Sequence, residues 1–477
     1  MEKIIELTDD DIKKLFYDNP IIETPFVKSA KVIFADYIAS GRVSPYIEEW
    51  LIKNIYPYYA NTHSNASCGI MMKNEINKTK QQIRQLYNLR PSHQIIFTGN
   101  GTTGAINHLT NLIDYKKYTK INIYVSVYEH YSNYLPWAEI VKTNKNCSIE
   151  YIPINDNDDV DIEWINNKLN QLNSTCDCFN IFSITGCSNV TGIITPIKEI
   201  SNIINKYNNG KNNNMLFVDY ACSAPYKRID ASYIDAFFIS PHKFIGGHST
   251  PGILVADSKL FMNSKPYAPG GGCVKKANCS IIQYEEDLEK KESGGTPNII
   301  GIIKLQKVFD LFEQYEDVIS HNEKIITSYI HNELTKIANK YKNIKFIFPN
   351  KSTDHRLPII ALAIDDMHYN YIVVLLNDFF GIQTRGGISC CGIFGDLIKK
   401  KYNIDGWCRI SFHWTMKPTE INYILYAVKF VAKYGNLFKN YYKYDKSKNL
   451  FTYSHSRTYN IDPTKMEYKI NQKLKIT

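Results

Sequence analysis

The sequence lacks both a hydrophobic run long enough to cross a membrane and a cysteine pattern of the zinc-finger kind. No segment approaches the roughly 18 consecutive apolar residues of a membrane helix, and the N-terminal segment MEKIIELTDDDIKKLF is too polar for a signal peptide. The 11 cysteines contain no recurring C-x-x-C pair, and the lone C-x-C at Cys176 and Cys178 is more typical of a loop. These absences predict a cytoplasmic protein with mostly reduced thiols, no metal site and no membrane association.

A strong charge bias is missing as well. The 56 Lys and Arg residues and 47 Asp and Glu residues give a net charge of +9, which is mild over 477 residues. Basic residues are scattered rather than gathered into one stripe, so nucleic-acid binding is not expected. The sequence has no internal repeat and no long linker. Its length nevertheless predicts more than one hydrophobic core.

Short apolar runs alternate with helical patterns through the first part of the chain. The runs are QIIF (94–97), INIYVSV (121–127), NIFSIT (180–185), MLFVDY (215–220) and AFFIS (236–240). Their β-branched and aromatic residues predict the strands of a mostly parallel sheet sandwiched by helices, which is an α/β fold.

A second lobe is expected after the long helical stretch that begins near Ile299. There, LPIIALAI (357–364), a helical segment at 368–380 and CRISFHW (408–414) predict a smaller α+β domain. The sequence assigns no role to the Tyr- and Lys-rich tail. We therefore divide the chain into an N-terminal arm (1–30), a large domain (31–300), a small C-terminal domain (301–435) and a C-terminal extension (436–477).

Residues that follow the strands of an open parallel sheet are candidates for a site, because ligands bind beyond the carboxyl ends of such strands. After QIIF, Gly99, Gly101 and Gly104 fit the G-x-G-x-x-G pattern of dinucleotide-binding proteins. That pattern also requires an acidic residue about 20 positions later, and none follows here. A glycine turn that opens a helix still presents amides to a phosphate, and Thr102 and Thr103 add hydroxyl donors. The segment predicts a phosphate site rather than an NAD site, with an ordinary tight turn as the alternative.

Three further strand ends carry polar side chains that suit a flat ligand. His130 follows the second run and could carry a proton or stack on a ring. Asn189 follows the third run and offers an amide, although it also suits an ordinary turn. Asp219 ends an apolar strand, where burial would require a cationic partner such as a protonated heterocyclic nitrogen.

The last run ends in Ser240-Pro241-His242-Lys243. The serine and the histidine could bind a phosphate, and the lysine could form a Schiff base with a carbonyl, since burial lowers the pKa of lysine. Each residue alone has an ordinary explanation as part of a turn. Together, a phosphate site, an imidazole, an amide, a buried carboxylate and an amine form the set that pyridoxal phosphate (PLP) requires.

Ten segments between Val32 and Lys417 resemble motifs of one family. They are VIFADYIASG, YANTHSNAS, GNGTTGAIN, EHYSNYLPW, SNVTGIITPI, VDYACSAPY, SPHKFIGG, GGTPNI, TRGGISCCG and CRISFHW. In these motifs the chain resembles the class-V aminotransferases, PLP-dependent enzymes of fold type I, and among them the cysteine desulfurase-like branch. The resemblance implies a large PLP-binding domain, a small-molecule amino-acid substrate and a homodimer whose active sites are shared between the subunits.

The resemblance also implies roles for single residues. Lys243 would hold PLP as a Schiff base, His130 would stack on its ring, and Asp219 would pair with the pyridine nitrogen. Asn189 would lie near the ring hydroxyl. Cys222 replaces the glutamine usual in the family and weakens the support of that hydroxyl, because a thiol is a weak donor. The resemblance also implies that the cofactor phosphate is bound by Thr103, Ser240 and His242, next to Thr102, and by Thr296 of a second subunit. Arg409, assisted by Arg385, would bind the substrate carboxylate.

Cys390 lies five residues after Arg385, the spacing at which short-loop desulfurases place their nucleophilic cysteine, and Cys391 is its rival. The resemblance predicts conversion of L-cysteine to alanine, with Lys243 removing the Cα proton and a persulfide left on Cys390 for an acceptor protein. The predicted catalytic residues are therefore Lys243, Cys390 and His130. Two alternatives stay open: an aminotransferase or lyase for another amino acid, and a non-catalytic PLP-fold protein that binds a partner.

Overall fold

The computed structural model describes residues 3–173, 178–208, 213–348, 353 and 355–455. Its centre is a seven-stranded sheet whose strands lie in the order β4-β10-β9-β8-β7-β5-β6. In that order they span His93–Thr98, Gly252–Asp257, Ala236–Ile239, Asn213–Asp219, Phe179–Thr185, Ile121–Ser126 and Cys147–Ile152. β10 is antiparallel to both of its neighbours, whereas the pairs from β9 to β6 are parallel. The predicted mostly parallel sheet is confirmed.

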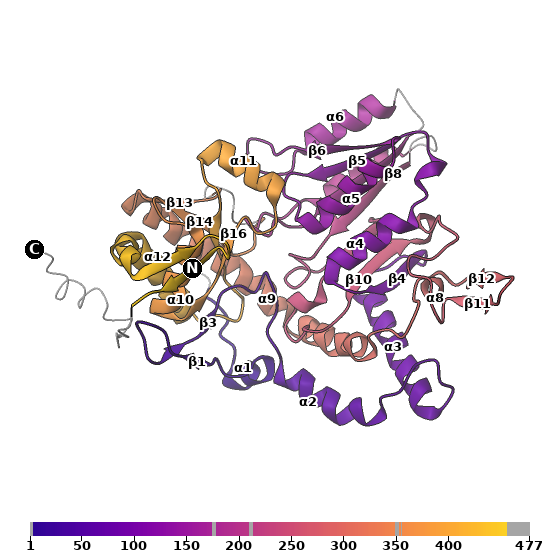
Figure 1. Ribbon diagram of the computed structural model, residues 1–477, viewed down its shortest axis with the longest axis horizontal. Coiled ribbons are helices and arrows are strands. Elements are labelled where there is room, and N and C mark those ends of the chain that lie inside the picture. The colour runs from indigo at the N-terminus through magenta and orange to yellow at the C-terminus, as the bar shows by residue number, and fades with distance from the viewer. Residues whose placement is uncertain (1–2, 174–177, 209–212, 349–352, 354, 456–477) are drawn as a thin grey trace, which may run out of the picture.

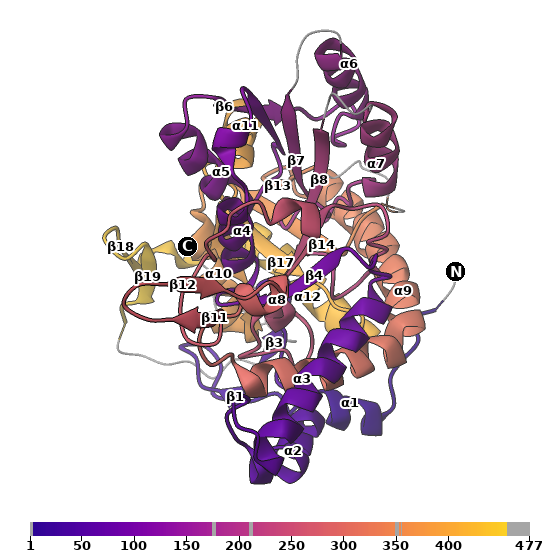
Figure 2. The same ribbon diagram turned by 90° about the vertical axis from the view of Figure 1, so that its right-hand side faces the viewer.

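Helices cover both faces of this sheet (Figure 2). Neighbouring strand residues divide between the two sides: Phe238 packs in the core beneath α4 and α5, and Phe237 in the core beneath α3 and α9. Because both faces are covered, the central strands are continuous apolar runs rather than alternating ones. The covering helices are α3 (Ser67–Leu86), α4 (Gly101–Leu112), α5 (Tyr131–Thr143), α6 (Ile162–Asn173), α7 (Ile197–Lys206) and α9 (Ile299–Lys340).

A second, antiparallel sheet lies in the C-terminal lobe, in the order β13-β14-β17-β16. Its strands span Ile344–Phe346, Ile359–Ile364, Trp407–Ser411 and Arg385–Gly387. The same lobe contains α10 (Tyr369–Phe380), α11 (Gly392–Tyr402) and α12 (Pro418–Tyr434). The 42-residue α9 connects the two lobes (Figure 1). The expected smaller α+β unit is therefore present, while the residues assigned to the domain boundaries stay a prediction.

The segment that opens the predicted large domain is joined to the C-terminal lobe. β3 (Ile33–Phe34) pairs in parallel with β15 (Ile382–Gln383), and Ser411 N donates to Ala35 O at 2.9 Å. A few residues later, Gly41 N donates to His242 O at 2.9 Å, so the segment also touches the end of the large sheet. The neighbouring N-terminal elements are α1 (Asp9–Leu15), β1 (Ile21–Ile22), β2 (Ala30–Lys31) and α2 (Pro45–Asn54).

Two hairpins lie outside the main sheets. β11 (Val274–Ala277) and β12 (Ile282–Tyr284), close to the short α8 (Leu288–Lys291), form one that projects from the molecule (Figure 1). β18 (Tyr442–Asp445) and β19 (Leu450–Tyr453) form the other. This second hairpin packs on α10, where Tyr442 Oη donates to Asp378 Oδ2 at 2.8 Å. The described part of the C-terminal extension is therefore part of the folded C-terminal lobe.

Most of the described cysteines are reduced, and the described part of the chain has neither a membrane-spanning helix nor a cluster of metal-ligating side chains. Nine cysteines are free thiols, and Cys178 is disulfide-bonded; Cys176 lies outside the described residues. Within the described ranges, no helix combines the length and the apolar character that a membrane crossing needs. In the same part of the chain, no three His, Cys, Asp or Glu side chains are grouped so as to hold a metal ion.

Candidate active site

A cavity of about 180 Å³ lies at the carboxyl ends of the parallel strands. Both lobes contribute to its wall, since Ser389 belongs to the C-terminal lobe and Thr185 to the end of β7. Cys390 and Thr296 are not part of this wall. Eleven residues singled out in the sequence are brought together here: Thr102, Thr103, His130, Asn189, Asp219, Cys222, Ser240, His242, Lys243, Arg385 and Arg409.

The predicted phosphate site lies at the N-terminus of α4. Gly101 has a φ of +55°, and a Cβ at this position would lie 2.6 Å from Ser240 Oγ. The glycine therefore permits both the left-handed turn and the close approach of the loop that follows β9. Thr102 N donates to Ser240 Oγ at 2.9 Å, and Thr103 Oγ1 lies 2.6 Å from Ser132 Oγ. These amides and hydroxyls form a donor-rich corner suited to an anion.

Both histidines of the cavity are neutral at pH 7. Burial, followed by the charges of Lys243 and Arg409, lowers the pKa of His130 to about 4. Burial and the charge of Lys243 likewise lower the pKa of His242 to about 4. His130 is also the N-cap of α5, where its Nδ1 accepts a hydrogen bond from Ser132 N at 3.1 Å. The sequence suggested that His130 could either carry a proton or stack on a ring. A fixed, neutral imidazole favours stacking.

Glu129, next to His130, is a buried residue to which the sequence analysis gave no role. Its carboxyl oxygens accept from Ser126 Oγ at 2.5 Å, Asn133 Nδ2 at 2.6 Å and Thr185 N at 2.8 Å. Burial raises the pKa of Glu129 to about 8, against the effect of these donors. The side chain connects the ends of β5 and β7 with the first turn of α5, and so fixes the segment that carries His130. In the sequence, only the position of Glu129 within the EHYSN motif indicated that this residue could contribute to the site.

Asp219 and Lys243 form the polar centre of the cavity. Asp219 is 2% exposed, and burial raises its pKa to about 6, against the Ala221 N–H donor at 2.9 Å and the charge of Lys243. Burial also lowers the pKa of Lys243, although the charges of Cys222 and Asp219 oppose that effect. A lysine with a lowered pKa is more readily the neutral amine that attacks a carbonyl.

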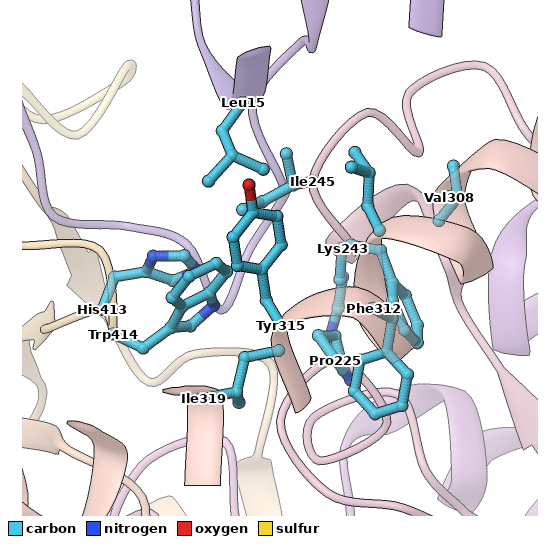
Figure 3. A pocket seen from close by; sticks show the side chains of 12 residues that line it. Leu15, Pro225, Lys243, Ile245, Val308, Phe312, Tyr315, Ile319, His413 and Trp414 are labelled. Atoms are coloured by element: carbon cyan, nitrogen blue, oxygen red, sulfur yellow. The ribbon is translucent and has the colours of Figure 1, made fainter. Parts of the chain in front are cut away.

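An apolar pocket on the other side of Lys243 contributes to its burial. The pocket has a volume of only about 20 Å³. Figure 3 shows Lys243 among apolar neighbours that include Pro225, Ile245 and Phe312. Lys243 lines both this pocket and the larger cavity. The lysine therefore stands between an apolar layer and the polar site, which is the setting that favours its uncharged form.

Cys222, the departure from the family pattern, is paired with a second thiol. It is hydrogen-bonded to Cys187, and both cysteines line the cavity. The hydrogen bond from Cys187 is the largest cause that lowers the pKa of Cys222; burial opposes it, and the charges of Lys243 and Arg409 add to it. Cys187 Sγ also lies 3.2 Å from Gly192 O. This pairing was not predicted from the sequence, since the two cysteines follow different strands.

The two predicted substrate arginines lie together at the C-terminal-lobe side of the cavity. Arg409 is 2% exposed, and its guanidinium donates to Asn189 O at 3.1 Å and Asp36 Oδ1 at 2.7 Å. Arg385 Nε lies 3.2 Å from Asp36 Oδ2. Asp36 was not identified from the sequence, because its contacts depend on the pairing of β3 with β15 rather than on a local motif.

The loop that follows Arg385 separates the two candidate nucleophiles. Cys391 is buried, its Sγ donates to Asn189 Oδ1 at 2.8 Å, and burial strongly raises its pKa. Cys390 is exposed, and its carbonyl accepts from Tyr131 N at 2.7 Å, directly after His130. Ser389 and Cys390 have φ values of 55° and 56°, a left-handed pair that is unfavourable for such residues. Because of this turn, the side chain of Cys391 lies in the core, whereas that of Cys390 stays accessible beside the cavity.

Thr296 lies away from the cavity of its own chain. It is exposed, and its Oγ1 accepts a hydrogen bond from Asn61 Nδ2 at 3.0 Å. A contact between Thr296 and a cofactor phosphate would therefore require the cavity of a second copy.

The residues of the cavity fit PLP. The corner formed by α4 offers donors for a phosphate, and the buried Asp219 carboxylate, with its raised pKa, suits a cationic ring nitrogen. Lys243 offers an amine for the aldehyde, and His130 offers a neutral ring. This donor set can bind an anionic, flat, nitrogen-containing aldehyde and a carboxylate next to it.

The comparisons with known proteins agree with this chemistry. Residues 33–424 match the sequence model of the family described as aminotransferase class-V. A protein of Borreliella burgdorferi named "Probable cysteine desulfurase" is 28% identical over 440 residues, which cover 90% of this chain and 99% of the relative. The "Cysteine desulfurase" of Wigglesworthia glossinidia brevipalpis is 28% identical over 431 residues, or 89% of this chain and 98% of the relative.

Solved structures show the same fold. The apo structure of a cysteine desulfurase from Thermococcus onnurineus NA1 has a TM-score of 0.72 at 21% identity, covering 84% of this chain and 95% of the other. The cysteine desulfurase CsdA from Escherichia coli has a TM-score of 0.67 at 21% identity, covering 84% and 94%. The family resemblance and the fold expected from the sequence are confirmed.

Proposed function

Because the chain belongs to the aminotransferase class-V family, a family of PLP-dependent enzymes, we propose that it binds PLP in this cavity and removes sulfur from L-cysteine. The products would be alanine and a persulfide on Cys390. The similarity to named desulfurases over about 90% of the chain supports this reaction. The observation that carries it is the exposed thiol of Cys390, on the loop that leads from Arg385 along the cavity.

Four residues of the chain would hold the cofactor and start the reaction. Lys243 would bind the aldehyde carbon, Asp219 would face the ring nitrogen, and the neutral ring of His130 would lie against the cofactor. When bound, PLP would accept the electron pair left on the substrate Cα. The amine of Lys243, with its lowered pKa, would take the Cα proton. Arg409 would bind the substrate carboxylate as a charge-assisted pair.

Sulfur transfer would form one bond at Cys390 and break one bond in the substrate. The thiolate of Cys390 would attack the substrate sulfur, so that an S–S bond forms while the substrate Cβ–S bond breaks. The protons released by the two thiols would be recovered by the persulfide and by alanine, so that L-cysteine and one enzyme thiol give L-alanine and one persulfide. A thiol, either small or on an acceptor protein, would then remove the sulfur. Cys391 is the poorer candidate, since burial holds it as a thiol.

The test is the release of alanine and sulfide from L-cysteine in the presence of a thiol reductant. Cys390→Ser is expected to abolish both products while the PLP absorbance of the purified protein stays unchanged. Cys279→Ser is the matched control, because Cys279 is also an exposed free thiol but lies in the turn between β11 and β12 rather than on the loop that follows Arg385. Full activity of Cys390→Ser would contradict the assignment of the nucleophile.

The same assay separates the alternatives. An aminotransferase would consume another amino acid only when an oxo-acid acceptor is present, and Cys390→Ser would leave that activity intact. A non-catalytic protein would release no product from any amino acid. We favour the desulfurase, since the exposed thiol of Cys390 has a use in that reaction alone.

A homodimer is part of the proposal. Thr296, exposed on its own chain, would reach the phosphate site of the second subunit.

A further inference from the structure

Asp36 lies between the two arginines expected to bind the substrate carboxylate. Its Oδ1 accepts from a terminal nitrogen of Arg409 at 2.7 Å, and its Oδ2 lies 3.2 Å from Nε of Arg385. The backbone holds this position firmly, because Ala35 N donates to Gln383 O at 3.0 Å and Ala35 O accepts from Ser411 N. Asp36 therefore belongs to the same rigid unit as both guanidinium groups.

The hydrogen bonds of Arg409 to the protein use two of its five N–H donors and leave the others for a ligand. One terminal nitrogen donates to Asn189 O and the other to Asp36, whereas the buried Nε of Arg409 has no partner among the described residues. A buried guanidinium with an unsatisfied donor is costly unless a ligand completes its set. Arg385 is more accessible, with 51% of its side chain exposed.

The local charge limits what this end of the cavity can bind. Two guanidinium groups and one carboxylate leave a single positive charge. His130 faces both arginines but is neutral, and the amine of Lys243 is assigned to the cofactor. One substrate carboxylate would complete the charge balance. A second carboxylate would meet Asp36 without a free cation beside it, and like charges this close repel each other.

We propose that Asp36 is a specificity-determining residue that restricts the site to amino acids with one carboxylate and excludes acidic ones. This inference rests on the proposed function, because it takes Arg409 as the residue that binds the substrate carboxylate. Asp36 touches the two arginines rather than the reacting atoms. It acts by neutralising one of the two positive charges of these guanidinium groups, which would otherwise form a dicarboxylate site.

The test compares butyrate with succinate, which carry one and two carboxylates and have no amino group to react. Calorimetric titration of the PLP-loaded protein is expected to give at least 10-fold tighter binding of butyrate than of succinate. Asp36→Asn removes the charge but keeps the size and one oxygen acceptor, and is expected to shift the succinate-to-butyrate affinity ratio by at least 10-fold toward succinate. Asp36→Glu keeps the charge and is expected to retain the original preference.

The outcomes separate selectivity from a merely structural role. If Asp36→Asn and Asp36→Glu change the ratio equally, or if neither changes it, the inference is overturned. If Asp36→Asn does not fold, the wild-type protein still decides: succinate binding as tightly as butyrate, or binding of neither, also overturns it. The result is independent of desulfuration, since a protein that releases no alanine from L-cysteine can still show the shifted ratio.

Discussion

At the scale of the residue, burial sets the protonation state of the groups around Lys243. The pKa of His130 falls to about 4 and that of Asp219 rises to about 6, in each case chiefly because burial disfavours the charged form. Within the protein, the Asp219 carboxylate therefore has only partial compensation of its charge, from Lys243 and the Ala221 N–H group. This is a destabilising arrangement that binding of a cationic ring nitrogen would relieve, and it is typical of functional sites.

Asp219→Asn is therefore expected to stabilise the cofactor-free protein at neutral pH. A carboxyl whose folded pKa of about 6 exceeds its ordinary value of 3.8 lowers stability as pH rises between those values, by roughly 2–3 kcal/mol once it is fully ionised. The variant avoids this cost and can still accept the hydrogen bond from Ala221 N. Thermal denaturation is expected to show a higher midpoint than wild type at pH 7.5 and a much smaller difference at pH 4, where Asp219 of the folded protein is neutral.

The same variant is expected to bind PLP more weakly, because the ring nitrogen loses its charged partner. Equilibrium dialysis at pH 7.5 measures this loss independently of activity. A lower midpoint for Asp219→Asn at both pH values would contradict the account of Asp219 as a strained, buried charge.

At the scale of the element, the C-terminal hairpin is expected to stabilise the lobe that carries the arginines. The Tyr442 hydroxyl donates to the buried Asp378 on α10 at 2.8 Å, and the rings of Tyr442 and Tyr371 pack edge to face at 5.4 Å. Tyr442→Phe is expected to lower the free energy of unfolding by about 1–3 kcal/mol, since a buried carboxylate loses a donor. Urea denaturation followed by tryptophan fluorescence measures the effect.

Tyr444→Phe on the same strand is the matched control. Tyr444 is 38% exposed, and its hydroxyl donates to Asn449 Oδ1 at 2.9 Å near the surface. Its removal is expected to change stability by no more than about 0.5 kcal/mol. If the two variants were equally stable, the hairpin would be a loosely attached surface feature rather than a structural part of the lobe.

At the scale of the whole molecule, the limits of sequence reasoning follow from the distance between contacting segments. The strand ends that carry His130, Asp219 and Lys243 were predictable, because parallel strands bring their carboxyl ends to one edge of a sheet. Asp36 was not, since its place depends on a two-residue pairing between segments about 350 positions apart. The spacing after Arg385 made Cys390 the candidate nucleophile, but only the left-handed turn shows that it is exposed while Cys391 is buried.

The proposed role of Thr296 requires a second copy of the chain. The segment that leads into the β11–β12 hairpin is connected to the loop that carries Thr296, since Gly295 N donates to Gly271 O at 2.7 Å. Ile282 on this hairpin is 67% exposed, as expected of a residue that packs against a partner. Light scattering is expected to give a mass of about twice 55.1 kDa for the protein.

Ile282→Asp is expected to shift the protein toward the monomer and to weaken PLP binding, whereas Thr296→Ala is expected to weaken PLP binding without changing the mass. Ile21→Asp is the control, because Ile21 is 69% exposed but lies on β1, outside the hairpin. A wild-type monomer that retains PLP in full would exclude the shared site, since Thr296 does not line the cavity of its own chain.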